Sequence, residues 1–253
     1  SGSSLLYQSA IRTMAESPHR KAFAAAFHRA MRIPRSNLYS GVDDQMPLHL
    51  QEDARIPQLG FVGKYYQTGG TVILAINPGG GGDAYKERIA SDNIHLPAIE
   101  RFVESKSVNI ELFEEMNTSY IDAALTWRLW NILGPVIDAC GGVVQQYTFM
   151  NCFPFRTRED KSPRASALRA AWSRCIQPTL EILVPSRIIA LGKGNYKAGW
   201  ALSEMYVGSA EKVTIERTNG DRSIAPSAYE ELSRLRQRRK SKGTPLQIFQ
   251  MGS

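Results

Sequence analysis

The chain has few of the residues that build metal clusters and disulfide frameworks. Its 253 residues include only three cysteines and four histidines. The cysteines are scattered and odd in number, which argues against a disulfide scaffold and a four-thiolate cluster. The histidines lack the spacing of common zinc motifs. Scattered carboxylates leave a magnesium site open, but no local pattern indicates one, and we expect neither a metal nor a cofactor.

Long apolar runs are also missing. None approaches the ~20 residues that a helix needs to span a bilayer, and the given sequence shows no secretory signal. We therefore expect a cytoplasmic or nuclear protein that is not secreted and has no membrane partner.

Acidic residues are in the minority, with 24 Asp and Glu against 31 Lys and Arg, so the formal net charge is +7. This excess favours a polyanionic partner, and nucleic acid is the first candidate. The strongest basic run, residues 234–242, reads RLRQRRKSK. A solvated helix end explains the run as well as DNA contacts do. The candidate DNA-binding residues of this run are Arg234, Arg236, Arg238 and Arg239.

The order of the expected elements favours an α/β fold. Strands are predicted at residues 71–76, 146–151, 187–191 and 212–216, with a candidate edge strand at 246–249. Helices are predicted within 4–32 and at 121–133, 165–183, 195–206 and 229–239. Such alternation favours a three-layer α/β/α sandwich with a central, mostly parallel four-stranded sheet. We expect an N-terminal helical extension, residues 4–60, and one α/β/α domain, residues 61–250.

The most informative segment is residues 71–85, TVILAINPGGGGDAY, in which a short apolar strand leads into a glycine-rich loop. Ligands of open α/β sheets bind at the carboxyl ends of the strands. A loop without side chains brings its backbone N–H groups close to a phosphate, a sugar or a base. The lysine of a Walker phosphate loop is absent. The spacing Gly79-x-Gly81-x-x-Ala84 fits a dinucleotide fingerprint only formally, because no second strand ends in the required acidic residue.

A second predicted strand also ends in asparagine, in residues 149–156, FMNCFPFR. The amide of Asn151 has both a donor and an acceptor, which suits the edge of a pyrimidine. Phe153 or Phe155 is a candidate for stacking on a base. The alternative is that both phenylalanines are core residues and that Asn151 is a turn former.

Together these segments resemble the uracil-DNA glycosylase superfamily. Ala75–Gly79, AINPG, is similar to the first motif of its mismatch-specific and single-strand-selective branches. Asn151–Phe155, NCFPF, is similar to the second motif of the single-strand-selective branch. Residues 178–194, ending in IIALGKG, resemble a further strand and loop of the superfamily. The order and spacing of these segments, over about residues 65–240, carry the resemblance.

The resemblance implies a monofunctional glycosylase, a monomer that flips a pyrimidine out of single- or double-stranded DNA and hydrolyses its N-glycosidic bond without a cofactor. Asn77 would orient the attacking water, and Asn151 with nearby backbone N–H groups would stabilise the departing base. The implied base pocket consists of Ile76, Pro78, Gly79, Gly80, Tyr85 and Phe153. Further implied DNA contacts are Gly192, Lys193, Pro226 and Ser227.

The chain departs from the superfamily at the last motif, where Ala225-Pro226-Ser227 has alanine at the usual histidine or asparagine position. The four glycines also stand where relatives have bulkier residues. We therefore expect the substrate to be uracil or an enlarged pyrimidine, such as a hydroxymethylated or glucosylated cytosine of phage DNA. Excision would serve base-excision repair or antiviral defence. Two alternatives remain: a non-catalytic nucleic-acid-binding protein on the same fold, and a nucleotide- or dinucleotide-dependent enzyme that uses the glycine loop.

Overall fold

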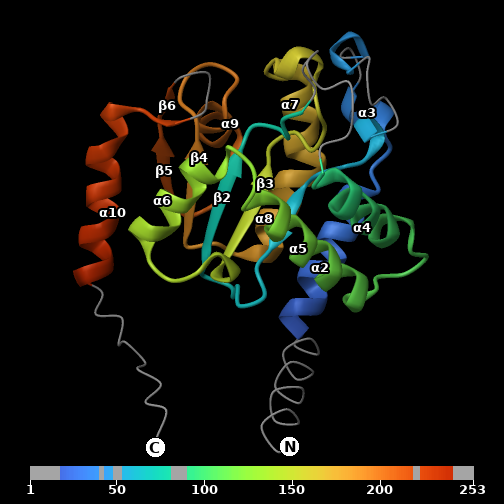
Figure 1. The fold of residues 1–253 in the computed structure, drawn as a ribbon, viewed down its shortest axis with the longest axis horizontal. Helices are drawn as coiled ribbons and strands as arrows, with labels where there is room; N and C mark the ends of the chain where they lie inside the picture. The colour runs from blue at the N-terminus through green and yellow to red at the C-terminus, as the bar shows by residue number, and fades with distance from the viewer. Residues whose placement is uncertain (1–17, 40–42, 48–52, 81–89, 219–222, 242–253) are drawn as a thin grey trace, which may run out of the picture.

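The computed structural model describes residues 18–39, 43–47, 53–80, 90–218 and 223–241 (Figure 1). The candidate edge strand at 246–249 lies outside these ranges, as do Tyr85, Gly81 and Gly82.

The core of the protein is a mostly parallel sheet with the order β1-β3-β2-β4-β5. Its parallel strands are β2 (Thr71–Ala75), β3 (Tyr147–Asn151), β4 (Arg187–Leu191) and β5 (Glu211–Ile215). The sheet has five strands where four were predicted, because β1 (Gly60–Val62) pairs antiparallel with β3. β1 has only three residues, all of them buried, so the sequence shows no alternation of apolar and polar residues there.

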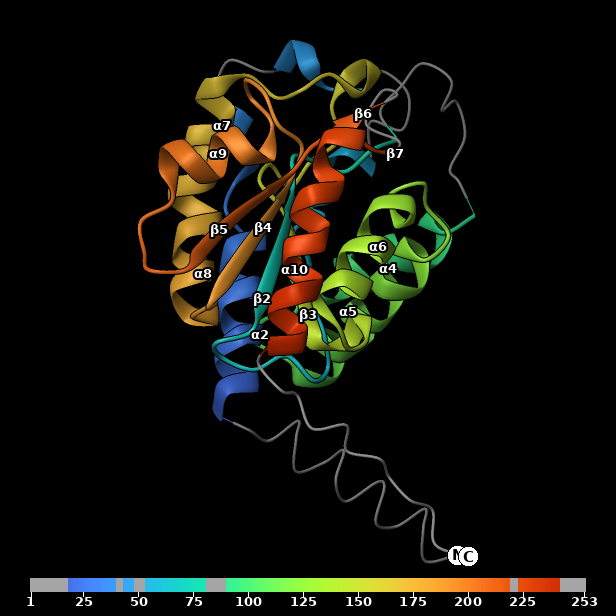
Figure 2. The ribbon, with the colours of Figure 1, turned by 90° about the vertical axis from the view of Figure 1, so that its left-hand side faces the viewer.

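Helices cover both faces of the sheet, which confirms the predicted three-layer α/β/α architecture (Figure 2). One layer contains α7 (Ala165–Ala171), α8 (Gln177–Leu183) and α9 (Ala198–Met205). The other contains α4 (Asp92–Glu104), α5 (Ile110–Ala124) and α6 (Trp130–Cys140), with α10 (Tyr229–Ser241) packed against α6. The remaining elements include α2 (Pro18–Met31), α3 (Arg35–Tyr39), β6 (Arg217–Thr218) and β7 (Ser223–Ile224).

Two predicted helices differ in detail. The helix predicted over 121–133 is the end of α5 and the start of α6, with a turn between them. The helix predicted over 165–183 contains a π-helical turn at Trp172–Ile176, just before the bend expected near Pro178.

The described part of the N-terminal segment belongs to the same core as the sheet. Phe23 and Phe27 of α2 are fully buried in one apolar cluster with Phe61 and Phe149. Arg20 donates hydrogen bonds to the carbonyl oxygens of Val62 and Gly63, each at 3.0 Å. The expected boundary at residue 60 is thus the first residue of β1, and the described residues on both sides of it share one core.

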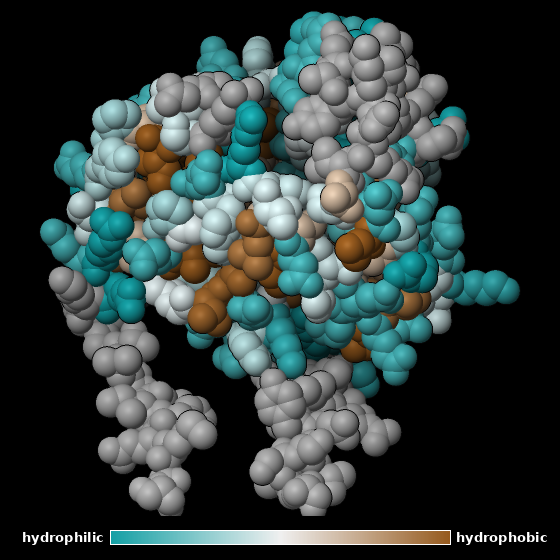
Figure 3. Space-filling view, viewed as in Figure 1, coloured by the Kyte–Doolittle hydropathy of each residue, from teal (hydrophilic) through white to brown (hydrophobic). Residues whose placement is uncertain are grey.

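The connectivity marks one place in the sheet where a ligand crevice is expected. From β2 the chain continues to β3 on one side, whereas from β4, the other neighbour of β2, it continues to β5 in the opposite direction. Ligands of open α/β sheets bind outside the carboxyl ends of the strands at such a switch point. These ends lie at the upper edge in Figure 1, and Figure 3 shows the surface hollowed above this edge.

Candidate functional site

Asn77 is the second residue after β2 at this switch point, and its side chain has a fixed orientation. Its Nδ2 donates to Thr157 Oγ1 at 3.1 Å, with longer contacts of 3.4 Å to the carbonyl oxygens of Phe155 and Pro78. Thr157 Oγ1 itself donates to the Lys161 carbonyl at 2.5 Å, so it can only accept from Asn77. All hydrogen bonds between the Asn77 side chain and the described residues are donated by Nδ2, and Oδ1 accepts none from them. A partly buried acceptor is thus presented at the start of the glycine loop.

Asn151 closes β3 and is 1% exposed. Its Nδ2 donates to the Gln58 carbonyl at 2.8 Å and to Tyr120 Oη at 3.1 Å, so both amide hydrogens are engaged. Burial raises the pKa of Tyr120 and keeps its hydroxyl neutral. In this arrangement Asn151 has no donor left for a base, and Oδ1 is the remaining hydrogen-bonding atom of its side chain.

Phe153 and Phe155 are packed in the interior, as the core alternative for them expects. They are 0% and 2% exposed, and their ring centroids lie 5.9 Å apart in an edge-to-face pair. The Phe153 N–H donates to the Ile76 carbonyl at 2.8 Å, which continues the pairing of β2 with β3. Phe153 therefore presents no ring face to solvent as it stands. Ile76 and Pro78 are also buried, whereas Gly79 is exposed.

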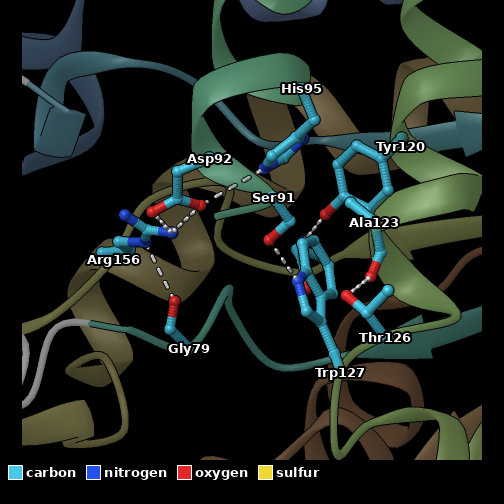
Figure 4. Close-up of polar contacts among 10 residues, drawn as sticks. Gly79, Ser91, Asp92, His95, Tyr120, Ala123, Thr126, Trp127 and Arg156 are labelled. Atoms are coloured by element: carbon cyan, nitrogen blue, oxygen red, sulfur yellow. Dashed lines mark hydrogen bonds and ion pairs between the residues drawn. The ribbon is translucent and has the colours of Figure 1, made fainter. Parts of the chain in front are cut away.

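A buried polar cluster beneath the glycine loop was not identified from the sequence (Figure 4). Arg156 Nε donates to the Gly79 carbonyl at 2.9 Å. Arg156 Nη2 contacts both carboxylate oxygens of Asp92, at 2.9 and 3.0 Å. His95 Nε2 lies 3.9 Å from Asp92 Oδ1. Asp92, His95 and Arg156 are each 1 to 2% exposed, so the loop rests on ionised and polar groups that water scarcely reaches.

His95 is a neutral imidazole held between aromatic rings. Its ring centroid lies 5.1 Å from that of Tyr120 and 5.3 Å from that of Trp127. Burial, and to a lesser degree the positive charge of Arg156, lowers the pKa of His95 to about 3. Neither ring nitrogen of His95 has a hydrogen-bond partner in the described part of the chain, and the same holds for Arg156 Nη1. Because buried polar atoms are normally paired, this cluster is a candidate part of the site.

The loop after β4 lies at the same edge of the sheet as the glycine loop, since β2 and β4 are adjacent and parallel. Gly192 is buried with φ +112°, and Lys193 is exposed. Tyr196 is 45% exposed, and its ring packs edge-on against Trp200 at 5.0 Å between centroids. The guanidinium of Arg169 lies 5.4 Å from the Trp200 ring centroid. The exposed Lys193 and Tyr196 of this loop, with Arg169 of α7 beside Trp200, bring cations and an exposed ring together, a combination suited to nucleic acid.

Pro226 and Ser227 are also near the carboxyl edge, because Ser227 Oγ donates to Glu216, the residue after β5. Both are exposed. Ala225 is 6% exposed, and its N–H donates to the Glu216 carbonyl at 2.9 Å.

The four arginines of α10 contact acidic or carbonyl groups of the protein. Arg238 pairs with Glu211, the first residue of β5, and Arg239 donates to the Asp138 carbonyl at 3.2 Å. These partners place the end of α10 toward the amino ends of the strands, the lower edge in Figure 1. Arg234 pairs with Glu230 and Glu231, and Arg236 lies 3.9 Å from Asp138. The contacts of Arg236, Arg238 and Arg239 thus lie away from the carboxyl edge of the sheet, whereas the partners of Arg234 are on its own helix.

No group of three or more His, Cys, Asp or Glu side chains is placed to hold a metal within the described ranges. None of the helices in those ranges combines the length and apolar character that crossing a bilayer requires. Comparison with protein-family models and with curated proteins found no match to the chain.

Proposed function

We propose that the protein is a monofunctional DNA glycosylase that releases uracil or a modified pyrimidine from DNA by hydrolysis. The observation that carries this proposal is the fixed amide of Asn77. At the switch point of the sheet its nitrogen is anchored to Thr157, and its oxygen accepts no hydrogen bond from the described residues. An acceptor held in this way can orient a water molecule by accepting one of its protons in a hydrogen bond.

The proposed reaction needs orientation more than a strong base. The N-glycosidic bond breaks, its electron pair leaves with the base, and the oriented water forms the new bond to the sugar carbon. The water then loses a proton to solvent and the base anion gains one, which leaves an abasic sugar and a neutral base. Positive charge develops on the sugar and negative charge on the base. An amide oxygen suffices to orient the water, because cleavage is well advanced before the water attacks. Correct placement of reacting groups contributes several kcal/mol to such a step.

The structure alters the role proposed for Asn151. Both of its amide hydrogens are engaged by Gln58 and Tyr120, so its Oδ1 would accept from a donor on the base edge. The developing charge on the base would then be stabilised by backbone N–H groups of the glycine loop. Gly79 suits this role because a Cβ added there would meet no atom within 4 Å.

DNA is the proposed partner, and the loop after β4 is the best-placed contact. Lys193 and Tyr196 are exposed at the edge that holds Asn77. The net charge of +7 supports an electrostatic contribution to binding. We further propose that the protein acts as a monomer in the cytoplasm or nucleus, in repair or in antiviral defence.

The test is a product assay on synthetic oligonucleotides that carry uracil, hydroxymethylcytosine or glucosylated hydroxymethylcytosine, each in single and double strands. Alkaline cleavage detects the abasic site, and mass spectrometry identifies the released base. Base release from any of these supports the proposal, and release of uracil alone would remove the enlarged-pyrimidine substrate. Tight DNA binding without base release from any of them would favour the non-catalytic alternative.

A further inference from the structure

Arg156 makes two different contacts with the glycine loop, whose described part is Asn77–Gly80. Its Nε donates to the Gly79 carbonyl at 2.9 Å. Its guanidinium also lies against Gly80, where an added Cβ would stand 3.1 Å from Nε and 3.2 Å from both Cζ and Nη2. Gly80 has φ +97°, a conformation that side chains rarely adopt. One buried side chain therefore contacts two successive residues of the loop.

Gly79 and Gly80 are adjacent but differ in the space that they leave for a side chain. A Cβ at Gly79 would meet nothing within 4 Å, and the residue is exposed. Gly80 is buried and confined by the guanidinium. The contact with Arg156 thus explains why glycine is needed at the second position and does not explain it at the first.

Asp92 determines where the guanidinium lies. Its two carboxylate oxygens accept from Arg156 Nη2 at 2.9 and 3.0 Å, and the side chains are 3% (Arg156) and 1% (Asp92) exposed. Asp92 is the first residue of α4, where the helix dipole favours a negative charge. The pair therefore connects the glycine loop to the start of a helix in the flanking layer (Figure 4).

We propose that Arg156, oriented by Asp92, is a positioning residue that fixes the backbone of the glycine loop and so the place of Asn77. The inference rests on the proposed function for its catalytic consequence. The placement of the loop itself can be measured without any activity.

The structural test is ¹⁵N relaxation of the backbone amides of Asn77, Gly79 and Gly80. In the wild type we expect order parameters near 0.85, typical of rigid backbone, and in Arg156→Lys values below about 0.6. Amides of α5, Ile110–Ala124, should not change. Arg101→Lys makes the same exchange in an exposed pair, that of Arg101 on α4 with Glu115 on α5, and is the matched control. A loop that stays rigid in Arg156→Lys, or one that is already mobile in the wild type, would overturn the proposal, as would equal loosening of α5.

The two glycines give a second test, and its comparison of the single alanine variants does not depend on how well a buried arginine variant folds. Gly80→Ala should lower the order parameters of the loop, and Gly79→Ala should leave them unchanged. In the double variant Gly80→Ala with Arg156→Lys, the effect of alanine should be smaller than in the wild-type background, because the guanidinium no longer confines it. Equal effects of the two alanines, or strictly additive effects in the double variant, would contradict the proposal.

Activity supplies the functional readout. If base release is found, Arg156→Lys and Gly80→Ala should lower the single-turnover rate at saturating DNA at least tenfold, with DNA affinity changed less than twofold. The control Arg101→Lys, an exchange at an exposed pair on α4 and α5, should retain the wild-type rate. A loss confined to DNA affinity would overturn the positioning role. Absence of base release by the wild type would refute the proposed function and leave the relaxation result to decide the inference.

Discussion

Exchanging Asp92 for asparagine is the most informative perturbation of stability. Asparagine keeps the volume of the side chain but removes the charge opposite Arg156, whose side chain is 3% exposed. Removing one partner of a buried ion pair typically costs about 3–5 kcal/mol, because the other charge stays buried without compensation. For a protein of this size such a loss corresponds to a fall in Tm of roughly 6–20 °C. Urea unfolding followed by tryptophan fluorescence and circular dichroism would measure the loss.

Two further variants separate this explanation from others. Glu115→Gln removes an equivalent pair with Arg101, whose side chains are 51% and 46% exposed, and should cost less than about 1 kcal/mol. Replacing Asp92 by leucine and Arg156 by methionine together should cost less than Asp92→Asn alone, because no charge is left buried. If Asp92→Asn is as mild as Glu115→Gln, the pair is not the buried, charge-compensated contact described above.

Three further predictions concern buried groups around the site. The free energy of unfolding should fall as pH drops from about 6.5 toward 3, by up to roughly 1.4 kcal/mol per pH unit from His95, because its pKa is lowered to about 3 only in the folded state; an unchanged pH slope in His95→Gln would contradict this. Tyr120→Phe should cost about 1–2 kcal/mol in urea unfolding by leaving an amide hydrogen of Asn151 unpaired, and a cost below about 0.5 kcal/mol would count against it. Burial raises the pKa of Cys152 and Cys175 to about 12, so iodoacetamide at pH 8 should label both only after unfolding. Labelling of either residue in the native protein, located by peptide mapping to separate it from the partly buried Cys140, would refute their burial.

The layered fold could be predicted because its long elements follow local patterns. The apolar run ending at Ile76 and the run RIIAL of β4 are buried, β-branched and bounded by turn residues, so their periods and ends are visible in the sequence. β1 was missed because Gly60–Val62 is short and pairs with β3 over contacts that no local signal reveals. The turn between α5 and α6 was missed because the apolar spacing continues through it.

Only the part of the candidate site that is formed by neighbouring residues in the sequence could be predicted. The glycine loop and Asn77 follow directly from a strand and its end, and the structure brings them to the expected edge of the sheet. The engagement of Asn151 by Tyr120 depends on contacts between residues far apart in the chain. The same is true of Asp92 with Arg156. Such pairs have no fixed spacing in sequence, so only the folded chain shows them.

The basic run of α10 illustrates how composition can mislead about position. The run is strongly basic, but Arg238 and Arg239 contact groups near the amino ends of the strands, away from Asn77. The exposed Lys193 after β4 is closer to the predicted reaction than the more conspicuous run. The loop that follows a strand determines which charges face a ligand at the edge of the sheet.

The most direct measurement is the single-turnover rate of abasic-site formation by the wild type and by Asn77→Ala on the best substrate of the oligonucleotide panel. Asn131→Ala, an exposed asparagine on α6, is the matched control. If Asn77 orients the water, Asn77→Ala should lose about a hundredfold or more in rate, the scale expected when a reacting group is misplaced, while DNA affinity and the rate of the control stay near wild type. A wild-type rate of base release by Asn77→Ala would contradict the proposed mechanism.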